Sequence, residues 1–281
     1  MTHEKKGMVS LKKPLIVIRG GGSFASAIAH RLYRVGYDVL MLEQARPAAI
    51  RREVAFSEAV YKGIKTVERI DCYCASNIKE AELFIKNGRL TMLVDPIGRY
   101  LPRLLRKFIV VDALKSEVQR EPIPGALYTI SLGAGFSAGQ DVDCVIETLR
   151  GHDLGRLIYK GRSKKPTGLV MAIVDGMEHL ITSPAAGIIE GKRIISSLVK
   201  KGDVIAEIFT DDCKYVEVVS PLDGVLRGVI HDGCRVQPGM RVAEVDPRSE
   251  AENCFHISDR ARCVSGSVLE AIMVFERGLK K

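Results

Sequence analysis

The sequence predicts an α/β protein with two unlike halves. The first is an N-terminal Rossmann-like parallel sheet, and the second is a C-terminal all-β barrel-sandwich hybrid of lipoyl or biotinyl type, followed by a terminal helix. Three observations predict this architecture. A strand, a glycine-rich loop, a helix and a second strand follow one another between residues 13 and 43. Residues 181–208 align without gaps on residues 218–245, and an amphipathic helical pattern returns near residue 267.

The first half begins with a βαβ unit. LIVIRG is a short, continuously apolar run that ends in glycine, as a strand buried on both faces does. Ala25, Ile28, Ala29 and Leu32 then recur at helical spacing, and Gly36 ends the helix. YDVLMLE is the second buried strand. A strand, a helix and a strand in this order predict a parallel sheet.

Later runs extend the parallel sheet. LTMLVD (90–95), KFIVVDA (107–113) and LYTISLG (127–133) each predict a strand. A helix is expected around LPRLLRK, because Pro102 suits a first helical turn. We therefore expect residues 13–150 to form a doubly wound nucleotide-binding domain, preceded by a disordered tail over residues 1–12.

The second half contains an internal repeat with an offset of 37 residues. The matched residues are Ser183 and Ser220, Pro184 and Pro221, Gly187 and Gly224, Gly191 and Gly228, Val199 and Val236, Gly202 and Gly239, Ala206 and Ala243, and Glu207 and Glu244. Neither unit of short strands can bury its apolar face alone, so the two units are expected to close on each other with pseudo-twofold symmetry. This predicts a lipoyl-like barrel-sandwich over residues 151–250.

Residues 251–281 are expected to form a connector and a C-terminal helix. Ser267 and Glu270 fit a capping box, and Val268, Leu269 and Ile272 belong to an apolar face. The helix should pack back on the body of the protein.

Composition narrows the function classes. The 281 residues are 46% hydrophobic and 27% charged, which is typical of a globular protein. The net charge is +8, but the basic residues are scattered, Trp is absent and aromatic residues make up only 6%, so no nucleic-acid partner is expected. The seven cysteines form no Cys-x-x-Cys pair, and the sequence shows neither a secretory leader nor a membrane-length apolar run. A cytoplasmic protein without a membrane partner is therefore expected.

The first candidate site is a G-x-G-x-x-A loop between a strand and a helix, formed by Gly20, Gly22, Ser23 and Ala25. Glycines let a dinucleotide's phosphates approach the backbone at a helix N-terminus. Glu43 ends the second strand, where an acid can bind a ribose 2′-hydroxyl. The loop predicts an adenine nucleotide site, for NAD(P) or ATP, and the alternative is a tight turn that binds nothing.

A second glycine-rich loop follows the strand at 127–133. Gly133, Gly135 and Gly139 form it, and Asp141 follows. Two glycine loops at strand ends of one sheet would create a phosphate or metal-phosphate cleft at the carboxyl edge. A domain-joining loop with solvated acids is the alternative.

Other catalytic signatures are missing. There is no Gly-x-Ser-x-Gly elbow, phosphate-loop lysine motif or zinc-spaced cysteine set, so neither a catalytic residue nor a metal site is assigned. Residues 207–224 look like the hairpin of a lipoyl or biotinyl carrier. Asp212 lies at the place of the carrier lysine, and Lys214 follows two residues later. Because aspartate cannot form the required amide, no lipoyl or biotinyl group is expected.

Several longer segments together resemble the YqeB family. They are IRGGGSFASAIAHRLYRVGYDVLMLE, RPAAIRREVAFSEAVYKG, LGAGFSAGQDVDCVIETLRGHDLGR, and VDPR with SVLEAI. The resemblance extends from about Pro14 to Phe275, although Ser23 replaces an aspartate that is usual in that family. It implies an association with selenium-dependent molybdenum hydroxylases, and a nucleotide-binding half distantly similar to the XdhC/CoxI accessory proteins.

The leading functional hypothesis is therefore an accessory protein for maturation or cofactor insertion of a selenium-dependent molybdenum hydroxylase. Its Rossmann-like half would bind a nucleotide or molybdopterin, and its barrel would dock the hydroxylase or another maturation protein, or form a homo-oligomer. An NAD(P)-linked oxidoreductase that uses Glu43 is the first alternative. A non-catalytic scaffold with two empty loops is the second.

Overall fold

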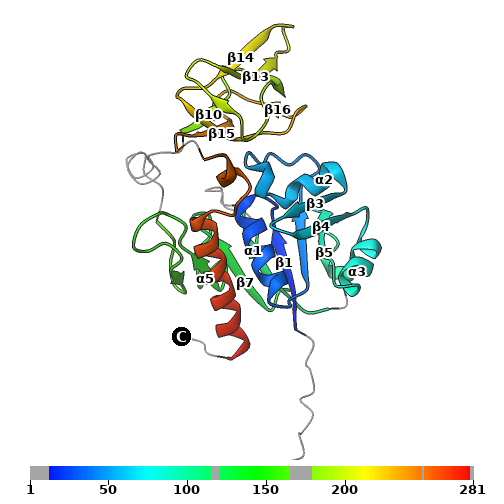
Figure 1. Ribbon diagram of the computed structural model, residues 1–281. Helices are drawn as coiled ribbons and strands as arrows, with labels where there is room; N and C mark the ends of the chain where they lie inside the picture. The colour runs from blue at the N-terminus through cyan, green and yellow to red at the C-terminus, as the bar shows by residue number, and fades with distance from the viewer. Residues whose placement is uncertain (1–12, 105, 115–120, 165–178, 249, 279–281) are drawn as a thin grey trace, which may run out of the picture.

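A large mixed sheet dominates the computed structural model, which describes residues 13–104, 106–114, 121–164, 179–248 and 250–278 (Figure 1). The tail predicted over residues 1–12 lies outside this described part. The nine strands follow the spatial order β3 (Ile64–Val67), β4 (Ile70–Ala75), β5 (Leu90–Val94), β2 (Val39–Glu43), β1 (Leu15–Arg19), β6 (Phe108–Asp112), β7 (Tyr128–Leu132), β8 (Cys144–Ile146) and β9 (Leu157–Ile158).

The sheet differs from the predicted wholly parallel one at both edges. In this spatial order, every neighbouring pair from β4 through β2 and β1 to β8 is parallel. At the two edges, β3 pairs with β4 and β9 pairs with β8 in antiparallel orientation. At the β3 edge the connection explains the difference, because only Glu68 and Arg69 join β3 to β4, and so short a turn returns the chain in the opposite direction. The connections inside the sheet also differ from the predicted ones. Between β5 and β6 the expected helix is only a 3-10 turn, η3 (Leu101–Arg103), and β7 reaches β8 through the second glycine loop. These crossovers lack the long helices that cover both faces of a doubly wound sheet.

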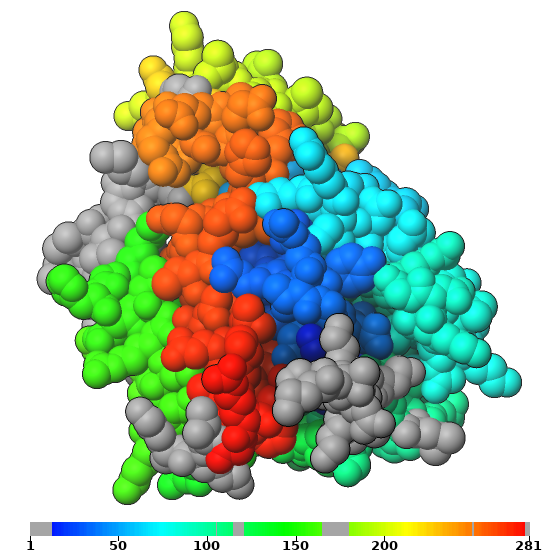
Figure 2. Space-filling model, turned by 60° about the horizontal axis from the view of Figure 1, so that its bottom comes forward, coloured from blue at the N-terminus to red at the C-terminus, as the bar shows by residue number. Residues whose placement is uncertain are grey.

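Helices from distant parts of the chain cover one face instead. Helices α1 (Ser23–Arg34) and α5 (Asp259–Glu276) lie side by side there (Figures 1 and 2). Helix α3 (Ile78–Lys86) packs on the opposite face. Alternate residues of β1 enter the two cores: Ile16 and Ile18 pack with α1 and α5, and Val17 packs with α3. The short helix α2 (Ala59–Lys62) follows the 3-10 turns η1 (Arg52–Val54) and η2 (Phe56–Glu58).

The C-terminal helix is longer than predicted. It begins at Asp259, where the Ser258 side chain accepts a hydrogen bond from the Ala261 backbone N–H. Ser267 and Glu270 therefore lie inside the helix and form no capping box. The connector holds one further 3-10 turn, η4 (Ala251–Cys254).

The repeat maps onto eight short strands. They are β10 (His179–Thr182), β11 (Gly187–Gly191), β12 (Leu198–Val199), β13 (Val204–Phe209), β14 (Tyr215–Val219), β15 (Gly224–Val229), β16 (Arg235–Val236) and β17 (Arg241–Asp246). One sheet has the order β10-β17-β15-β12 and the other β14-β13-β11-β16. Exchanging the two repeats converts one order into the other, so the predicted internal symmetry is confirmed.

The fold class predicted for the whole chain is nevertheless wrong. The repeat strands form two separate four-stranded antiparallel sheets rather than a lipoyl-like barrel-sandwich, and the N-terminal sheet is mixed rather than Rossmann-like and parallel. Each small sheet takes two strands from each repeat, and one apolar core contains residues of both sheets. A sequence period fixes where strands and turns recur, but it does not fix how those strands are distributed between sheets.

The two four-stranded sheets, called the small sheets below, contact the domain built on the nine-stranded sheet through the segment after β2. The Arg52 side chain donates to the Val229 carbonyl at 2.7 Å, and the Tyr61 ring stacks on His231 with centroids 3.8 Å apart. Among the described residues, none of the helices combines the length and apolar character needed to cross a membrane.

Candidate functional site

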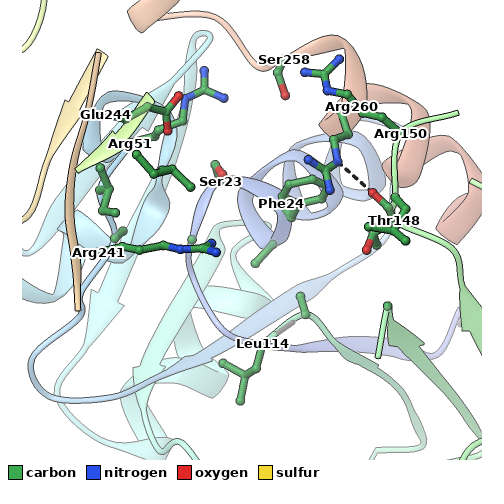
Figure 3. A pocket seen from close by; sticks show the side chains of 18 of the residues that line it. Ser23, Phe24, Arg51, Leu114, Thr148, Arg150, Arg241, Glu244, Ser258 and Arg260 are labelled. Carbon is green, nitrogen blue, oxygen red and sulfur yellow. Dashed lines mark hydrogen bonds between the residues drawn. The ribbon is translucent and has the colours of Figure 1, made fainter. Parts of the chain in front are cut away.

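A pocket of about 670 Å³ lies where the carboxyl ends of the large sheet meet the small sheets (Figure 3). Its lining comes from the first glycine loop with the start of α1, the loop after β2, the loop after β6, and the start of the second glycine loop. Residues 148–150, Lys164, the small sheets and the start of α5 complete it. The lining residues include Gly22, Ser23, Ala25, Ile50, Arg51, Leu114, Gly133, Ala134, Thr148, Arg150, Lys164, Arg241, Glu244, Ser258 and Arg260.

The lining carries an excess of positive charge. Among the described residues, the lining has five basic side chains and one carboxylate, that of Glu244; the basic side chains are those of Arg51, Arg150, Lys164, Arg241 and Arg260. The Arg260 Nε donates to the Thr148 carbonyl at 2.8 Å, which fixes its guanidinium beside the start of α1. Because low-dielectric walls focus such a field, the pocket favours an anionic ligand.

The three glycines of the first loop have different roles. Gly20 needs its φ of +104°, which side-chain-bearing residues rarely adopt. A Cβ on Gly21 would lie 2.9 Å from the Met92 Cε and 3.0 Å from the Ser57 Cβ, so close packing excludes a side chain there. Gly22 has a φ of −68° and open space where its Cβ would be. Of these three glycines, Gly22 is thus the one that neither backbone conformation nor packing requires to be glycine.

The N-terminus of α1 opens into this space. Gly22 occupies the N-cap position, no side chain caps the helix, and its first turn contains no acidic residue. Backbone N–H groups at such an end carry partial positive charge and bind phosphate well. Ser23 and Ala25 line the pocket with Gly22, as the sequence predicted for a ligand loop.

Glu43 supports the loop and does not line the pocket. Its Oε2 accepts a hydrogen bond of 2.7 Å from the Gly21 N–H, and its Oε1 accepts one of 2.8 Å from the Gln44 N–H. Burial raises the pKa of Glu43 although these two hydrogen bonds lower it. The side chain predicted to bind a ribose hydroxyl is thus 8% exposed and already hydrogen-bonded to the loop backbone.

This buried carboxyl should make stability depend on pH. The folded-state pKa of Glu43 lies above the ordinary 4.5, so the folded protein holds this proton more tightly than the unfolded chain does. The resulting contribution to the free energy of unfolding is fully present below about pH 4.5 and is lost as pH rises through the folded-state pKa. Urea titrations followed by circular dichroism measure the unfolding free energies of wild type and Glu43→Gln. The wild-type value minus the variant value should fall as pH rises. The exposed control Glu82→Gln should show no such trend. A difference that grows with pH would contradict this prediction.

The second glycine loop reaches the pocket only at its start. Gly133 lines the pocket, and its φ of +64° and a Cβ position 2.7 Å from the Thr148 Oγ1 both require glycine. Gly135 and Gly139 have φ values of +116° and +81° and do not line it. The Asp141 carboxylate accepts a hydrogen bond from the Ser137 N–H at 2.8 Å, so it closes its own loop.

No metal-binding group is evident in the described part of the chain: no three side chains of His, Cys, Asp or Glu gather there as metal ligands. Glu147, near the pocket, accepts hydrogen bonds from the Thr148, Leu149 and Lys164 N–H groups. In the β13–β14 hairpin, the exposed Lys214 pairs with Asp212 at 2.7 Å. The absence of a lipoyl or biotinyl group stays a prediction.

Sequence reasoning missed the basic residues of the pocket. Arg51, Arg150, Arg241 and Arg260 come from four separate segments, and each looks like an ordinary surface cation in the sequence. The repeat offered one signal for Arg241: the equivalent residue of the first unit is Val204, so an arginine at this position is not needed by the repeated structure.

Comparison with known proteins identifies one sequence relative. No protein-family model matches the chain. The relative "Uncharacterized protein YqeB" from Escherichia coli (strain K12) is 40% identical over 274 residues, which make up 95% of this chain and 49% of the relative. The chain thus spans about half the length of the curated relative it matches.

Similarity to solved structures is weak. The ectoine utilization protein EutE (DoeB) from Ruegeria pomeroyi and an aspartoacylase family protein from Mesorhizobium loti have TM-scores of 0.27 and 0.29 and identities of 13% and 12%. In each case 83% of this chain and 85% of the other are covered. Such low TM-scores carry no argument about this chain. By sequence, the chain is a relative of YqeB, which it matches at 40% identity over 95% of its own length.

Proposed function

We propose that the pocket binds a phosphate-bearing organic molecule, either a nucleotide or the phosphorylated part of a pterin cofactor. The observation that carries the proposal is the meeting of an uncapped helix N-terminus, an open Gly22 and five basic side chains in one pocket. Each favours an anion by a different physical route: backbone N–H groups, room for close approach, and net positive charge.

The chain would act as an accessory protein in maturation of, or cofactor insertion into, a selenium-dependent molybdenum hydroxylase. This role follows the family resemblance, and the hydroxylase or another maturation protein would be its partner. The molybdenum cofactor would be the cargo. The phosphate-binding pocket supports this role because the pterin part of such a cofactor carries a phosphate group.

The geometry favours this role over an NAD(P)-linked oxidoreductase. Glu43 already accepts hydrogen bonds from Gly21 and Gln44, so it is not placed to bind a ribose hydroxyl. Asp141 and Glu147 likewise accept backbone N–H groups of nearby loops. These acids hold loop backbone in place rather than offering a proton-transfer group to a substrate.

Gly22→Ala is expected to weaken ligand binding by about tenfold or more while changing the unfolding free energy by only about 1 kcal/mol. The added methyl group meets no protein atom within 4 Å but occupies the space at the helix N-terminus where a phosphate would lie. Calorimetric titration with ATP, CTP, NAD and NADP measures the affinity, and urea unfolding measures the stability.

Gly191→Ala is the matched control, because that glycine lies in the small sheets and a Cβ there is nearest to the movable Asp232 carboxylate. It should bind like wild type. If a ligand binds wild type and Gly22→Ala equally well, this loop is the wrong site. If none of the four binds wild type at millimolar concentration, the nucleotide assignment fails.

Native mass spectrometry of the protein purified from its own host tests the wider role. A retained nucleotide or pterin should appear as added mass that is lost in Gly22→Ala. A ligand-free mass for wild type would favour the scaffold alternative.

A further inference from the structure

Arg241 is the cation that the small sheets add to the pocket. It lies on β17, it is exposed, and its side chain extends toward Ser23 (Figure 3). Within the described part of the chain its guanidinium makes no hydrogen bond or ion pair. Two other cations of the pocket are paired, Arg150 with Asp259 at 3.2 Å and Lys164 with Asp153. Arg241 therefore keeps its full hydrogen-bonding capacity for a ligand.

The internal repeat shows that the fold does not need an arginine at this position. The equivalent residue in the first unit is Val204, which begins β13 as Arg241 begins β17. Their neighbours match, with Ala206 equivalent to Ala243. The two strands thus share one local structure, and a charge replaces valine only in the copy that faces the pocket.

Arg241 and Arg260 lie on different sides of the first glycine loop. In Figure 3, Arg241 approaches from the small sheets near Arg51, whereas Arg260 lies across Phe24 with its guanidinium 5.5 Å from the ring centroid. A single phosphate at the N-terminus of α1 would engage the Arg260 side. The guanidinium on the opposite side is then available to a second anionic group, which arginine can bind through directed paired hydrogen bonds.

We infer that the ligand carries two phosphate groups on different atoms, one bound at the N-terminus of α1 beside Arg260 and the other by Arg241. This inference rests on the proposed function and specifies its ligand class. The ligand contacts both the large domain and the small sheets, and Arg241 selects organic bisphosphates over monophosphates.

The test compares two probes that differ by one phosphate, AMP and adenosine 3′,5′-bisphosphate, by calorimetric titration of the full chain. Wild type should bind the bisphosphate about tenfold or more tightly than AMP, the gain expected of a hydrogen bond to a charged group. Arg241→Val, which installs the residue of the first repeat, should abolish this preference, because it should weaken bisphosphate binding much more than AMP binding. Arg235→Val removes an exposed arginine of β16 outside the pocket and should keep the preference.

The outcomes separate the inference from the proposed function. If wild type binds both probes equally, or if Arg241→Val keeps the preference, the second phosphate site is wrong while the phosphate pocket stands. If neither AMP nor the bisphosphate binds wild type, and ATP, CTP, NAD and NADP do not bind it either, the proposed function fails and the inference fails with it.

Discussion

Replacing Gly187 or Gly224 by alanine is expected to destabilise the protein by about 3 kcal/mol or more, because each added Cβ would collide with the backbone of a neighbouring strand. A Cβ on Gly187 would lie 2.3 Å from the Phe209 carbonyl oxygen, and one on Gly224 would lie 2.5 Å from the Asp246 carbonyl oxygen. The two glycines are equivalent in the repeat, and so are the two carbonyls. Backbone atoms held in a sheet cannot move aside without breaking strand pairing.

Urea unfolding followed by circular dichroism measures this effect. Gly187→Ala should disrupt the pairing of β11 with β13, and Gly224→Ala that of β15 with β17. The two losses should be similar because the contacts are repeated. Gly22→Ala is the control, since its Cβ would enter open space. Wild-type unfolding midpoints for both variants would refute the close approach of these strands.

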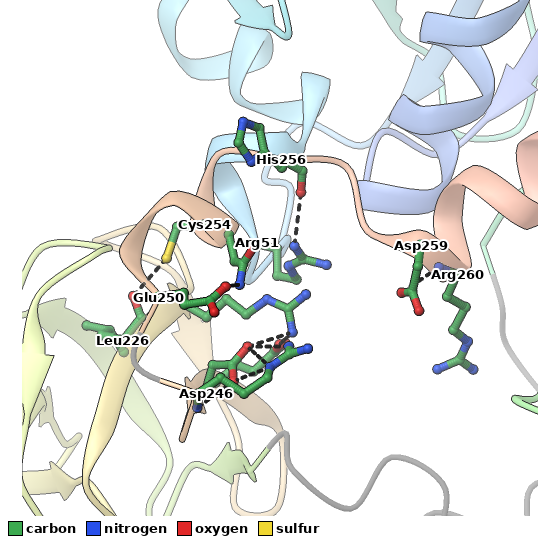
Figure 4. A network of polar contacts seen from close by, with 12 residues as sticks. Arg51, Leu226, Asp246, Glu250, Cys254, His256, Asp259 and Arg260 are labelled. Carbon is green, nitrogen blue, oxygen red and sulfur yellow. Dashed lines mark hydrogen bonds and ion pairs between the residues drawn. The ribbon is translucent and has the colours of Figure 1, made fainter.

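Replacing Arg227 by methionine is expected to cost about 3–5 kcal/mol, since it leaves buried carboxylates without their cation. The Arg227 side chain is 4% exposed, and its Nη1 lies 3.2 Å from a Glu244 oxygen and 3.5 Å from an Asp246 oxygen. This cluster lies at the junction of the small sheets and the connector to α5 (Figure 4). Arg248 also binds Asp246, so Glu244 should bear most of the loss.

The pH dependence identifies the cause of this loss. Burial alone would raise the pKa of Asp246, but hydrogen bonds from Arg248 and the nearby charge of Arg227 hold it below its ordinary value. The resulting stability is present above about pH 3.8 and is lost as pH falls through the folded-state pKa. Arg227→Met should therefore cost more near neutral pH than in acid.

A double variant is the control for lost packing volume. Arg227→Met with Glu244→Gln removes the cation and one carboxylate together, so it should recover part of the stability lost in the single variant. Urea titrations at neutral and acid pH measure both effects. A penalty independent of pH, with no recovery in the double variant, would assign the loss to packing alone.

The sequence predicted local elements better than their assembly. The β1–α1–β2 unit and the repeat strands follow from apolar periodicity and glycine positions, which act over a few residues. The antiparallel edges β3 and β9 escaped prediction because β3 is largely exposed and β9 has only two residues, so neither shows the apolar run of a buried strand. Helix α5 was placed too late because Ser258 caps it through a backbone contact that a Ser-x-x-Glu pattern does not signal.

The candidate site was predicted in part for the same reason. Its glycine loops are local signals, and Gly22 and Gly133 do meet in one pocket. Its charges are not local, since Arg51, Arg241 and Arg260 come together only through folding. The role of Glu43 stays a prediction, because the spacing of an acid from a glycine loop does not show whether its carboxylate faces a ligand or, as the hydrogen-bonded Glu43 does here, the loop backbone.

The position of α5 against α1 has a consequence for synthesis on the ribosome. Buried α5 residues, among them Val264, Val268 and Ile272, complete the core that covers the sheet around Ile16 and Ile18. The ribosome makes α5 after both repeats, so the part of this face that α5 covers beside α1 stays exposed while the small sheets are being translated. Such late, long-range closure slows folding and leaves apolar surface exposed meanwhile. The nascent chain thus has a defined interval in which a chaperone can bind it, ending when residues 259–276 emerge.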